Sequence, residues 1–381
     1  MDSTSNYFEL LKFCLNEDQP VPSCIKDINW HDLLVFATKH AIPGIFLPTI
    51  LMENGRLSKD DFMGNKPSDE DVMEWVFEGH RLRKNNTTLF GRTVKASEWF
   101  LENGFRNCIL KGQGNAIMYP DPYMRTCGDI DIWLEGGREK ILEFTNQYYS
   151  GRKASSIHVD FPMFRDAEVE VHFRPSYMLN PFIDRKVKKY FEEVASSQFT
   201  NKVTSPDGKY SFNIPTNTFN LFFQLLHIYR HIIKEGIGLR QIIDYYYLLR
   251  KAKGDGMTEA DKNELVKVLK RFRMLKFARA IMYIEQSLLG LDRDYLYVEP
   301  DEKEGKFIIN EVLEAGNFGK YETRMNKSMK GARGHVKRFL ILESFHYRLL
   351  LHYPSESFWV PFYDFRGHLR RRLKGEPVDD D

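Results

Sequence analysis

Apolar residues along the first hundred positions of the chain follow a helical spacing. In DINWHDLLVFATKHAIPGIFLPTIL, residues 27–51, they recur three and four positions apart, as on one face of a helix. Ser68 precedes a run of acidic residues and has the position of an N-cap, while Asn103 and Gly104 have those of a C-cap. Between these caps the chain has no proline. The pattern predicts a helical lead-in that ends in one long helix.

After Gly104 the pattern changes to short apolar or alternating runs, bounded by glycine, proline and acidic residues. A helical segment, REKILEFTNQYY at 138–149, lies among them. The runs predict a small α/β unit with four strands, in RNCILKG (106–112), GDIDIWL (128–134), IHVDFPMF (157–164) and AEVEVHF (167–173).

Helical periodicity returns from about Pro215. We predict an α+β protein with an N-terminal helical region at 1–80, an α/β core with a small mixed sheet at 81–214 and a C-terminal helical domain at 215–381. The tail RGHLRRRLKGEPVDDD is expected to be frayed. The predicted C-terminal helices are LFFQLLHIYRHIIKEG (221–236), LRQIIDYYYLLRKA (239–252), EADKNELVKVLKRFRMLKFARAIMYIEQ (259–286) and GHVKRFLILESFHYRLLLHY (334–353).

Composition narrows the class of protein without identifying a function. The 55 basic and 53 acidic residues leave a net charge of +2, which gives no strong signal for nucleic acid or an acidic membrane. The chain has only four cysteines, and none of them form a CxxC pair. This sparse pattern is typical of a protein with reduced thiols. The first residues show no signal-peptide pattern, and no apolar run approaches the length of a membrane span. We expect a soluble, cytoplasmic protein.

Two acidic residues stand one position apart in the predicted strand GDIDIWL. Side chains two apart on a strand share a face, so Asp129 and Asp131 project together. Two such carboxylates repel each other unless a cation lies between them, and Mg²⁺ prefers oxygen ligands of this kind. Glu170, in AEVEVHF, is the candidate for a third ligand of one or two Mg²⁺ ions. The alternative is a solvated polar face of a sheet.

The segment ILKGQG places a glycine turn before the acidic strand. Such a turn offers backbone N–H groups to an anion, and Lys111 and Arg125 would add positive charge for a triphosphate. A tight turn without a ligand remains the alternative for Gly112 and Gly114.

The order of these segments resembles the nucleotidyltransferase superfamily, whose members include DNA polymerase beta. More narrowly, LKGxxxAxxYPDPxxRxxGDIDIWL followed by IHVDF and VEVHFRP resembles an uncharacterised nucleotidyltransferase family of bacterial proteins. The segments NWHDLLVFATKH, LLHIYRH, LRQIIDYYYLL and AGNFG also look like that family. The resemblance covers most of the chain.

This resemblance implies specific roles for the residues that match its motif. Asp129, Asp131 and Glu170 would be the catalytic metal ligands, and the nucleotide would contact Lys111, Gly112, Gln113, Arg125 and Gly128. The chain departs from the usual superfamily pattern at two positions. Gln113 replaces the commoner serine or glycine of the turn, and Glu170 replaces the commoner aspartate.

Several histidines and other polar residues of the predicted C-terminal helices have two possible interpretations, one functional and one structural. His158 and His172 could donate to a phosphate or activate an acceptor hydroxyl, or they could be hydrogen-bonding residues of the sheet. In the C-terminal helices, His227, His231, Arg240 and Asp244 could face the cleft or form a polar network between helices.

The first hypothesis is therefore a metal-dependent nucleotidyltransferase. It would move a nucleoside monophosphate from an NTP such as ATP to a hydroxyl of an unidentified acceptor, whether small molecule, protein or RNA. Glu170 would bind metal or help to deprotonate that hydroxyl. The alternative is a non-catalytic nucleotide-binding or protein-interaction module on the same fold. A two-carboxylate glycosidase or a metal nuclease leaves the glycine turn and Arg125 without roles.

Overall fold

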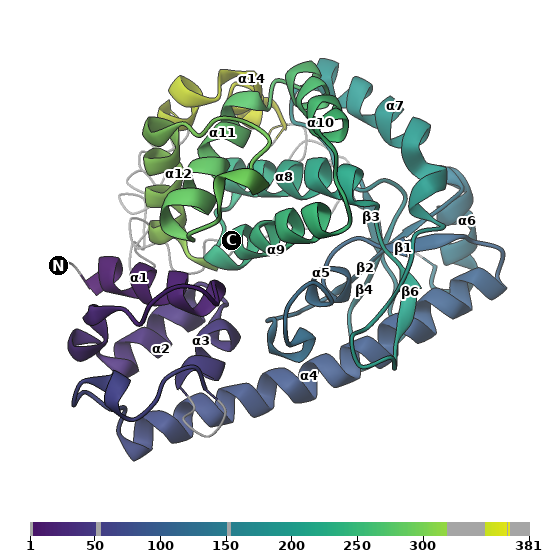
Figure 1. Cartoon of the computed structure of the whole chain (residues 1–381). Coiled ribbons are helices and arrows are strands. Elements are labelled where there is room, and N and C mark those ends of the chain that lie inside the picture. Colours follow the sequence, from purple (N-terminus) through teal and green to yellow (C-terminus); the bar gives the residue numbers. More distant parts are fainter. Residues whose placement is uncertain (1–2, 51–54, 151–153, 318–346, 364, 366–381) are drawn as a thin grey trace, which may run out of the picture.

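The structure is a computed structural model that describes residues 3–50, 55–150, 154–317, 347–363 and 365 (Figure 1). The expected α+β class is confirmed, since many helices surround one small mixed sheet and a two-stranded hairpin. Of the helix expected at 334–353, residues 347–352 are described and helical. The basic tail and part of AGNFG lie outside the described residues.

The N-terminal part is helical, as expected, and ends in the long helix α4, Asp69–Glu102. Ser68 and Asp71 form a capping box at its start: the Asp71 N–H donates to Ser68 Oγ at 3.1 Å, and the Ser68 N–H donates to Asp71 Oδ2 at 3.0 Å. Helix α4 runs without a break through residue 80, the boundary expected between the first two regions. The preceding elements are α1 (Ser3–Leu15), η1 (Ser23–Asp27), α2 (Trp30–Lys39), α3 (Pro43–Ile50) and η2 (Asp60–Phe62).

The central sheet contains the four expected strands in the order β1-β2-β4-β3. Strand β2 is antiparallel to β1 and parallel to β4, and β3 is antiparallel to β4, so the sheet is mixed. The register places Asp131 directly opposite Glu170. The bounds are β1 (Asn107–Ile109), α5 (Gln113–Ala116), η3 (Pro122–Met124), β2 (Ile130–Leu134), α6 (Gly137–Tyr148), β3 (His158–Asp160) and β4 (Val169–His172).

A helix and a hairpin that we did not predict follow the sheet. Helix α7, Pro181–Gln198, begins after Asn180, whose Oδ1 accepts from the N–H groups of Phe182 and Ile183. The hairpin pairs β5, Lys202–Thr204, with β6, Ser211–Asn213. The sequence did contain a helix-start signal that we overlooked, an asparagine and a proline followed by apolar residues spaced four positions apart.

The C-terminal part is a helical bundle in which one expected helix is divided. The segment 259–286 forms α10 and α11, separated at Arg273, which has a left-handed φ of 59°. The expectation of one continuous helix there was wrong. The segment contains no glycine or proline that could have indicated the break. The bundle comprises α8 (Asn217–Lys234), α9 (Leu239–Gly254), α10 (Glu259–Arg271), α11 (Leu275–Tyr283), η4 (Ile284–Leu288), η5 (Arg293–Tyr295), α12 (Glu302–Ala315) and α14 (Pro354–Ser357).

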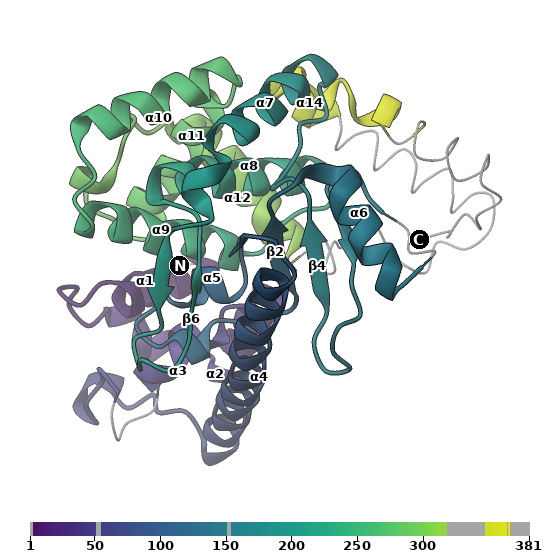
Figure 2. The same ribbon diagram turned by 90° about the vertical axis from the view of Figure 1, so that its right-hand side faces the viewer.

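The two faces of the sheet pack against different helices. One face contributes Ile130, Ile132 and Val171 to an apolar core that also contains Phe90 of α4 and Ile141 of α6, and α6 lies beside β2 and β4 in Figure 2. On the other face Trp133 contacts Phe199 and Phe219, with ring centroids 4.8 and 6.0 Å apart. Because Phe219 belongs to α8, this contact holds α8 over the face of the sheet that carries Asp131 and Glu170.

The N-terminal helices and the bundle share one hydrophobic core. Tyr246 of α9 donates through its hydroxyl to Asn16 Oδ1 at 2.7 Å, and Lys39 of α2 donates to the carbonyl of Leu313 in α12 at 2.6 Å. Segments from the two ends of the chain therefore pack together, with α4 extending from them to the sheet (Figure 1). Among the described helices, none is both long and apolar enough to cross a membrane.

Candidate metal and nucleotide site

Three carboxylates converge near the N-terminal ends of β2 and β4, the two central strands of the sheet. Asp129 precedes β2, Asp131 lies within it and Glu170 lies on β4, and one oxygen from each lies within 4.8 Å of the other two. The Asp131 side chain is only 1% exposed, whereas that of Glu170 is 26% exposed. The carboxyl group of Asp131 is therefore buried, which does not fit the alternative of a solvated polar strand face.

The pKa values of the three acids show how strongly their charges interact. The charge of Asp131, together with burial, raises the pKa of Asp129. Burial alone would raise the pKa of Asp131, but Lys111 and His172 outweigh it and lower that pKa. Burial is likewise outweighed at Glu170, whose pKa is lowered by His158, His172 and Lys111. Hydrogen bonds and nearby positive charge therefore stabilise the ionised form of two of the acids.

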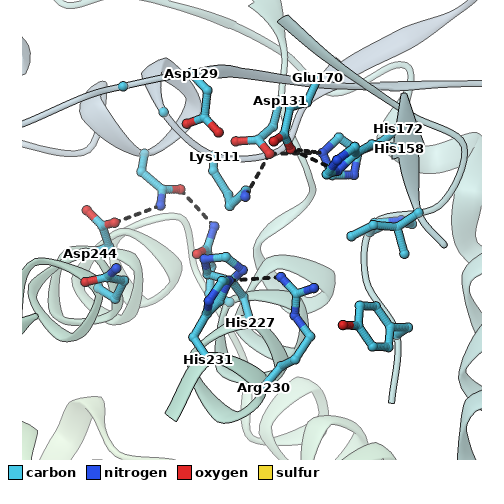
Figure 3. Close-up of a pocket in the computed structure, with 18 of the residues that line it drawn as sticks. Lys111, Asp129, Asp131, His158, Glu170, His172, His227, Arg230, His231 and Asp244 are labelled. Carbon is cyan, nitrogen blue, oxygen red and sulfur yellow. Dashed lines mark hydrogen bonds and ion pairs between the residues drawn. The ribbon is translucent and has the colours of Figure 1, made fainter. Parts of the chain in front are cut away.

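Lys111, from the turn after β1, already places a cation among these acids. Its Nζ lies 2.7 Å from Asp131 Oδ1. Burial would lower the pKa of Lys111, but the charges of Asp131, Asp129 and Glu170 raise it instead. The position of this ammonium group shows that the acids attract positive charge (Figure 3).

The glycine turn brings two backbone segments close together. Gly112 has a left-handed φ of 54°, and a Cβ atom there would lie 2.9 Å from the carbonyl oxygen of Asp129. Gly112 and Gly128 both line the cavity. Gln113 instead points toward α4, where its Nε2 donates to Asn86 Oδ1 at 3.0 Å, and it is not among the described residues that line the cavity. The helix after the turn, α5, is a single short turn.

Arg125 binds a carboxylate of the bundle. Its Nε and Nη2 donate to the two oxygens of Asp244 at 2.7 and 2.6 Å, and both side chains are at least 95% buried. Tyr119 and Asn115 also donate to Asp244, at 2.7 and 3.1 Å. Asp244 therefore joins α9 to the short helix α5 and to the segments that follow it in the α/β core. Arg240 follows the same pattern, with its Nη1 donating to the carbonyl of Thr126 at 2.8 Å.

His158 and His172 lie beside the acids. The Nε2 atom of His172 is 3.0 Å from Asp131 Oδ1 and 3.2 Å from Glu170 Oε2. Burial would lower the pKa of His172, but hydrogen bonds to Asp131 and Glu170 raise it. His158 Nδ1 lies 3.0 Å from Glu170 Oε2. Both imidazoles therefore contact the carboxylate set directly.

The opposite wall of the cavity comes from α8 and is neutral except for one arginine. Burial lowers the pKa of His227 well below its usual range and lowers that of His231 to about 4, so both rings are uncharged near neutral pH. Arg230 lies over the ring of Tyr177, 4.8 Å from its centroid. These α8 side chains face the acids across a cavity of about 320 Å³ (Figure 3).

Sequence reasoning missed some residues of this wall. Arg230 follows His227 by three positions and shares its side of α8, so helical spacing could have found it. Tyr177 lies in an irregular segment between β4 and α7, where no periodicity indicates which side chains enter a cavity.

A comparison with known protein families identifies the family of the chain. Residues 26–290 match a family described as "Uncharacterised nucleotidyltransferase". That match spans well over half of the chain, from η1 to the end of η4, and the chain belongs to this family. The resemblance inferred from the motif is thus confirmed at the level of the family. No curated protein and no solved structure matches the chain.

Proposed function

We propose that the protein is a metal-dependent nucleotidyltransferase that moves a nucleoside monophosphate from an NTP to a hydroxyl of an acceptor. Membership of the family supports the class of reaction. The observation that carries the proposal is the convergence of Asp129, buried Asp131 and Glu170 within 4.8 Å at the wall of a cavity.

The three carboxylates fit a hard divalent cation such as Mg²⁺. They supply only oxygen donors, and the raised pKa of Asp129 reflects repulsion from Asp131 that a cation would relieve. Asp129, Asp131 and Glu170 would hold one or two such ions. When bound, the metal neutralises charge on the phosphates of the nucleotide.

Other residues of the cavity bind and orient the nucleotide. Lys111 moves its ammonium group from Asp131 to the phosphates when a metal occupies the acids. Gly112 and Gly128, which carry no side chain, let the triphosphate approach the backbone. Arg125 is a positioning residue, because its Nε and Nη2 are bound to Asp244 and its Nη1 donates to Cys127 Sγ.

The chemical step is a displacement at the α-phosphorus. The oxygen of the acceptor hydroxyl bonds to that phosphorus, and the bond from phosphorus to the oxygen that bridges to the β-phosphate breaks. Pyrophosphate leaves, and the hydroxyl proton passes to water. Catalysis rests mainly on positioning and on fixed charges.

Release of pyrophosphate tests the proposal. Asp131→Asn keeps the shape of the side chain and removes its charge, so we expect release from ATP and the other NTPs, with pooled small-molecule, protein and RNA acceptors, to fall roughly a hundredfold or more. Asp294→Asn, at a residue 84% exposed far along the bundle, is the matched control and should retain the full rate. Equal rates in the Asp131 variant and the wild type would contradict the proposal.

One observation favours a second candidate, a non-catalytic nucleotide-binding module. The amide of Gln113 is bound to Asn86, so the turn offers no side-chain donor at that position to a phosphate. Nucleotide binding without pyrophosphate release across all acceptor pools would favour this module over the enzyme.

A further inference from the structure

A second set of metal-binding side chains lies next to the three carboxylates. His158 of β3 and His172 of β4 flank Glu170, and one donor atom from each of the three lies within 4.8 Å of the other two. The two imidazole rings have centroids 5.1 Å apart and meet at an angle of 70°. Both project to the side of the sheet that carries Asp131 (Figure 3).

The distances between these donor atoms suit a single ion. Glu170 Oε2 lies 3.0 Å from His158 Nδ1 and 3.2 Å from His172 Nε2. Around a tetrahedral Zn²⁺ ion with bonds of about 2.0–2.1 Å, neighbouring donor atoms are about 3.3–3.4 Å apart. Small adjustments of the side chains would therefore bring all three atoms into one coordination shell.

Hydrogen bonding alone does not account for the contact between His158 and Glu170. The Nδ1 atom of His158 is buried and forms no hydrogen bond with the described residues, although Glu170 Oε2 is 3.0 Å away. The two atoms are close but are not aligned for a hydrogen bond, and a shared metal ion would satisfy this buried nitrogen better. The other nitrogen of the ring, Nε2, lies 3.9 Å from Asp160 Oδ1. That distance is too long for a hydrogen bond, but the carboxylate places a negative charge beside the ring.

We propose that His158, His172 and Glu170 bind a divalent transition metal ion of the Zn²⁺ type. Imidazole nitrogens favour such ions, whereas Mg²⁺ favours the oxygen atoms of the neighbouring carboxylate set. Two histidines and one glutamate are also a ligand set that zinc sites use. The assignment goes beyond the proposed function, because this set requires no nucleotide to bind its ion. Glu170 is the ligand that both sets share.

Titration with Co²⁺ in place of Zn²⁺ tests this site by its visible absorption. The full chain, freed of metals with a chelator, is titrated with Co²⁺ in the presence of excess Mg²⁺ and without nucleotide. We expect one equivalent of Co²⁺ to bind with a visible band that Mg²⁺ does not displace. His158→Gln should weaken that binding by about tenfold or more. Asp129→Asn should keep the band, because Asp129 lies outside the ligand set.

Two controls make the result decisive. His158 is 23% exposed on an edge strand, so the variant is expected to fold, and its thermal midpoint is measured beside that of the wild type. His80→Gln removes an exposed histidine of α4 and should leave Co²⁺ binding unchanged.

The proposal is overturned if Co²⁺ binding is unaffected in a folded His158→Gln protein, if Asp129→Asn abolishes it or if excess Mg²⁺ displaces it. The readout needs no NTP, so a protein that releases no pyrophosphate but binds Co²⁺ as expected supports this site. Turnover without a histidine-dependent Co²⁺ signal would overturn this inference alone.

Discussion

At the scale of single residues, two buried carboxyl groups differ in whether they have hydrogen-bond or ion-pair partners. Asp131 is buried but lies 2.7 Å from Lys111 Nζ and 3.0 Å from His172 Nε2. Glu285, in the π-helical turn η4, is fully buried, and neither of its carboxyl oxygens has a hydrogen-bond partner among the described residues. The first arrangement keeps a charge inside the protein, while the second favours a neutral carboxyl group.

Replacing Glu285 should stabilise the protein, and more so at higher pH. Burial raises the pKa of Glu285 well above its usual range. The folded protein then keeps this proton at pH values where the unfolded chain has lost it. The free energy of unfolding therefore falls as the pH rises above about 4.3, by about 1.4 kcal/mol per pH unit, until the pH reaches the pKa of Glu285 in the folded protein. Glu285→Met removes that loss, and its gain in thermal midpoint should be larger at pH 8 than at pH 5.

The matched control is Glu192→Gln, at a glutamate of α7 that is 65% exposed, which should change the midpoint little at either pH. A gain for Glu285→Met that is equal at pH 5 and pH 8 would contradict the assignment of a buried, protonated carboxyl group.

At the scale of elements, the sequence predicted local structure better than contacts between elements. The alternation in GDIDIWL predicted β2 and the shared face of Asp129 and Asp131, because a strand has a strict period of two. The bond between Arg125 and Asp244, which are 119 positions apart, has no local signal. The role proposed for Arg125 therefore changed from a phosphate ligand to a positioning residue only once the structure placed it against α9.

The link between Arg125 and Asp244 should contribute strongly to stability. Asp244→Asn leaves the buried guanidinium without a countercharge, and we expect it to lower the free energy of unfolding by about 3–5 kcal/mol, measured by urea denaturation. The double variant Arg125→Met with Asp244→Leu should recover much of that loss, because it removes both members of the buried ion pair.

The surface pair of Arg106 and Glu135 is a matched control, since it has the same two-contact geometry but is 45% and 41% exposed. Glu135→Gln should therefore have a far smaller effect than Asp244→Asn. An equal loss of stability in the two single variants would show that burial does not explain the contribution of the Arg125–Asp244 pair to the free energy of unfolding.

At the scale of the whole molecule, the candidate site lies between the sheet and the bundle. The contact of Trp133 with Phe219 holds α8 over the acids, and Asp244 fixes α9 to the turn that carries Arg125. The three regions expected from the sequence stay a prediction, although the N-terminal helices and the bundle share one core. Periodicity identifies helices, but it does not show which distant helices pack together.

Binding of metal and nucleotide is the most direct test of the account. The thermal midpoint of the wild type is measured with ATP and with each other NTP, with and without Mg²⁺, beside Asp129→Asn, Asp131→Asn and the surface control Asp294→Asn. Ligand at a hundredfold excess over its dissociation constant stabilises the native state by about 2.7 kcal/mol, a shift that is easily measured. The account predicts stabilisation that requires both Mg²⁺ and a nucleotide, is lost in both site variants and is retained in the control. A folded wild type that responds to none of the NTPs in the presence of Mg²⁺ would contradict it.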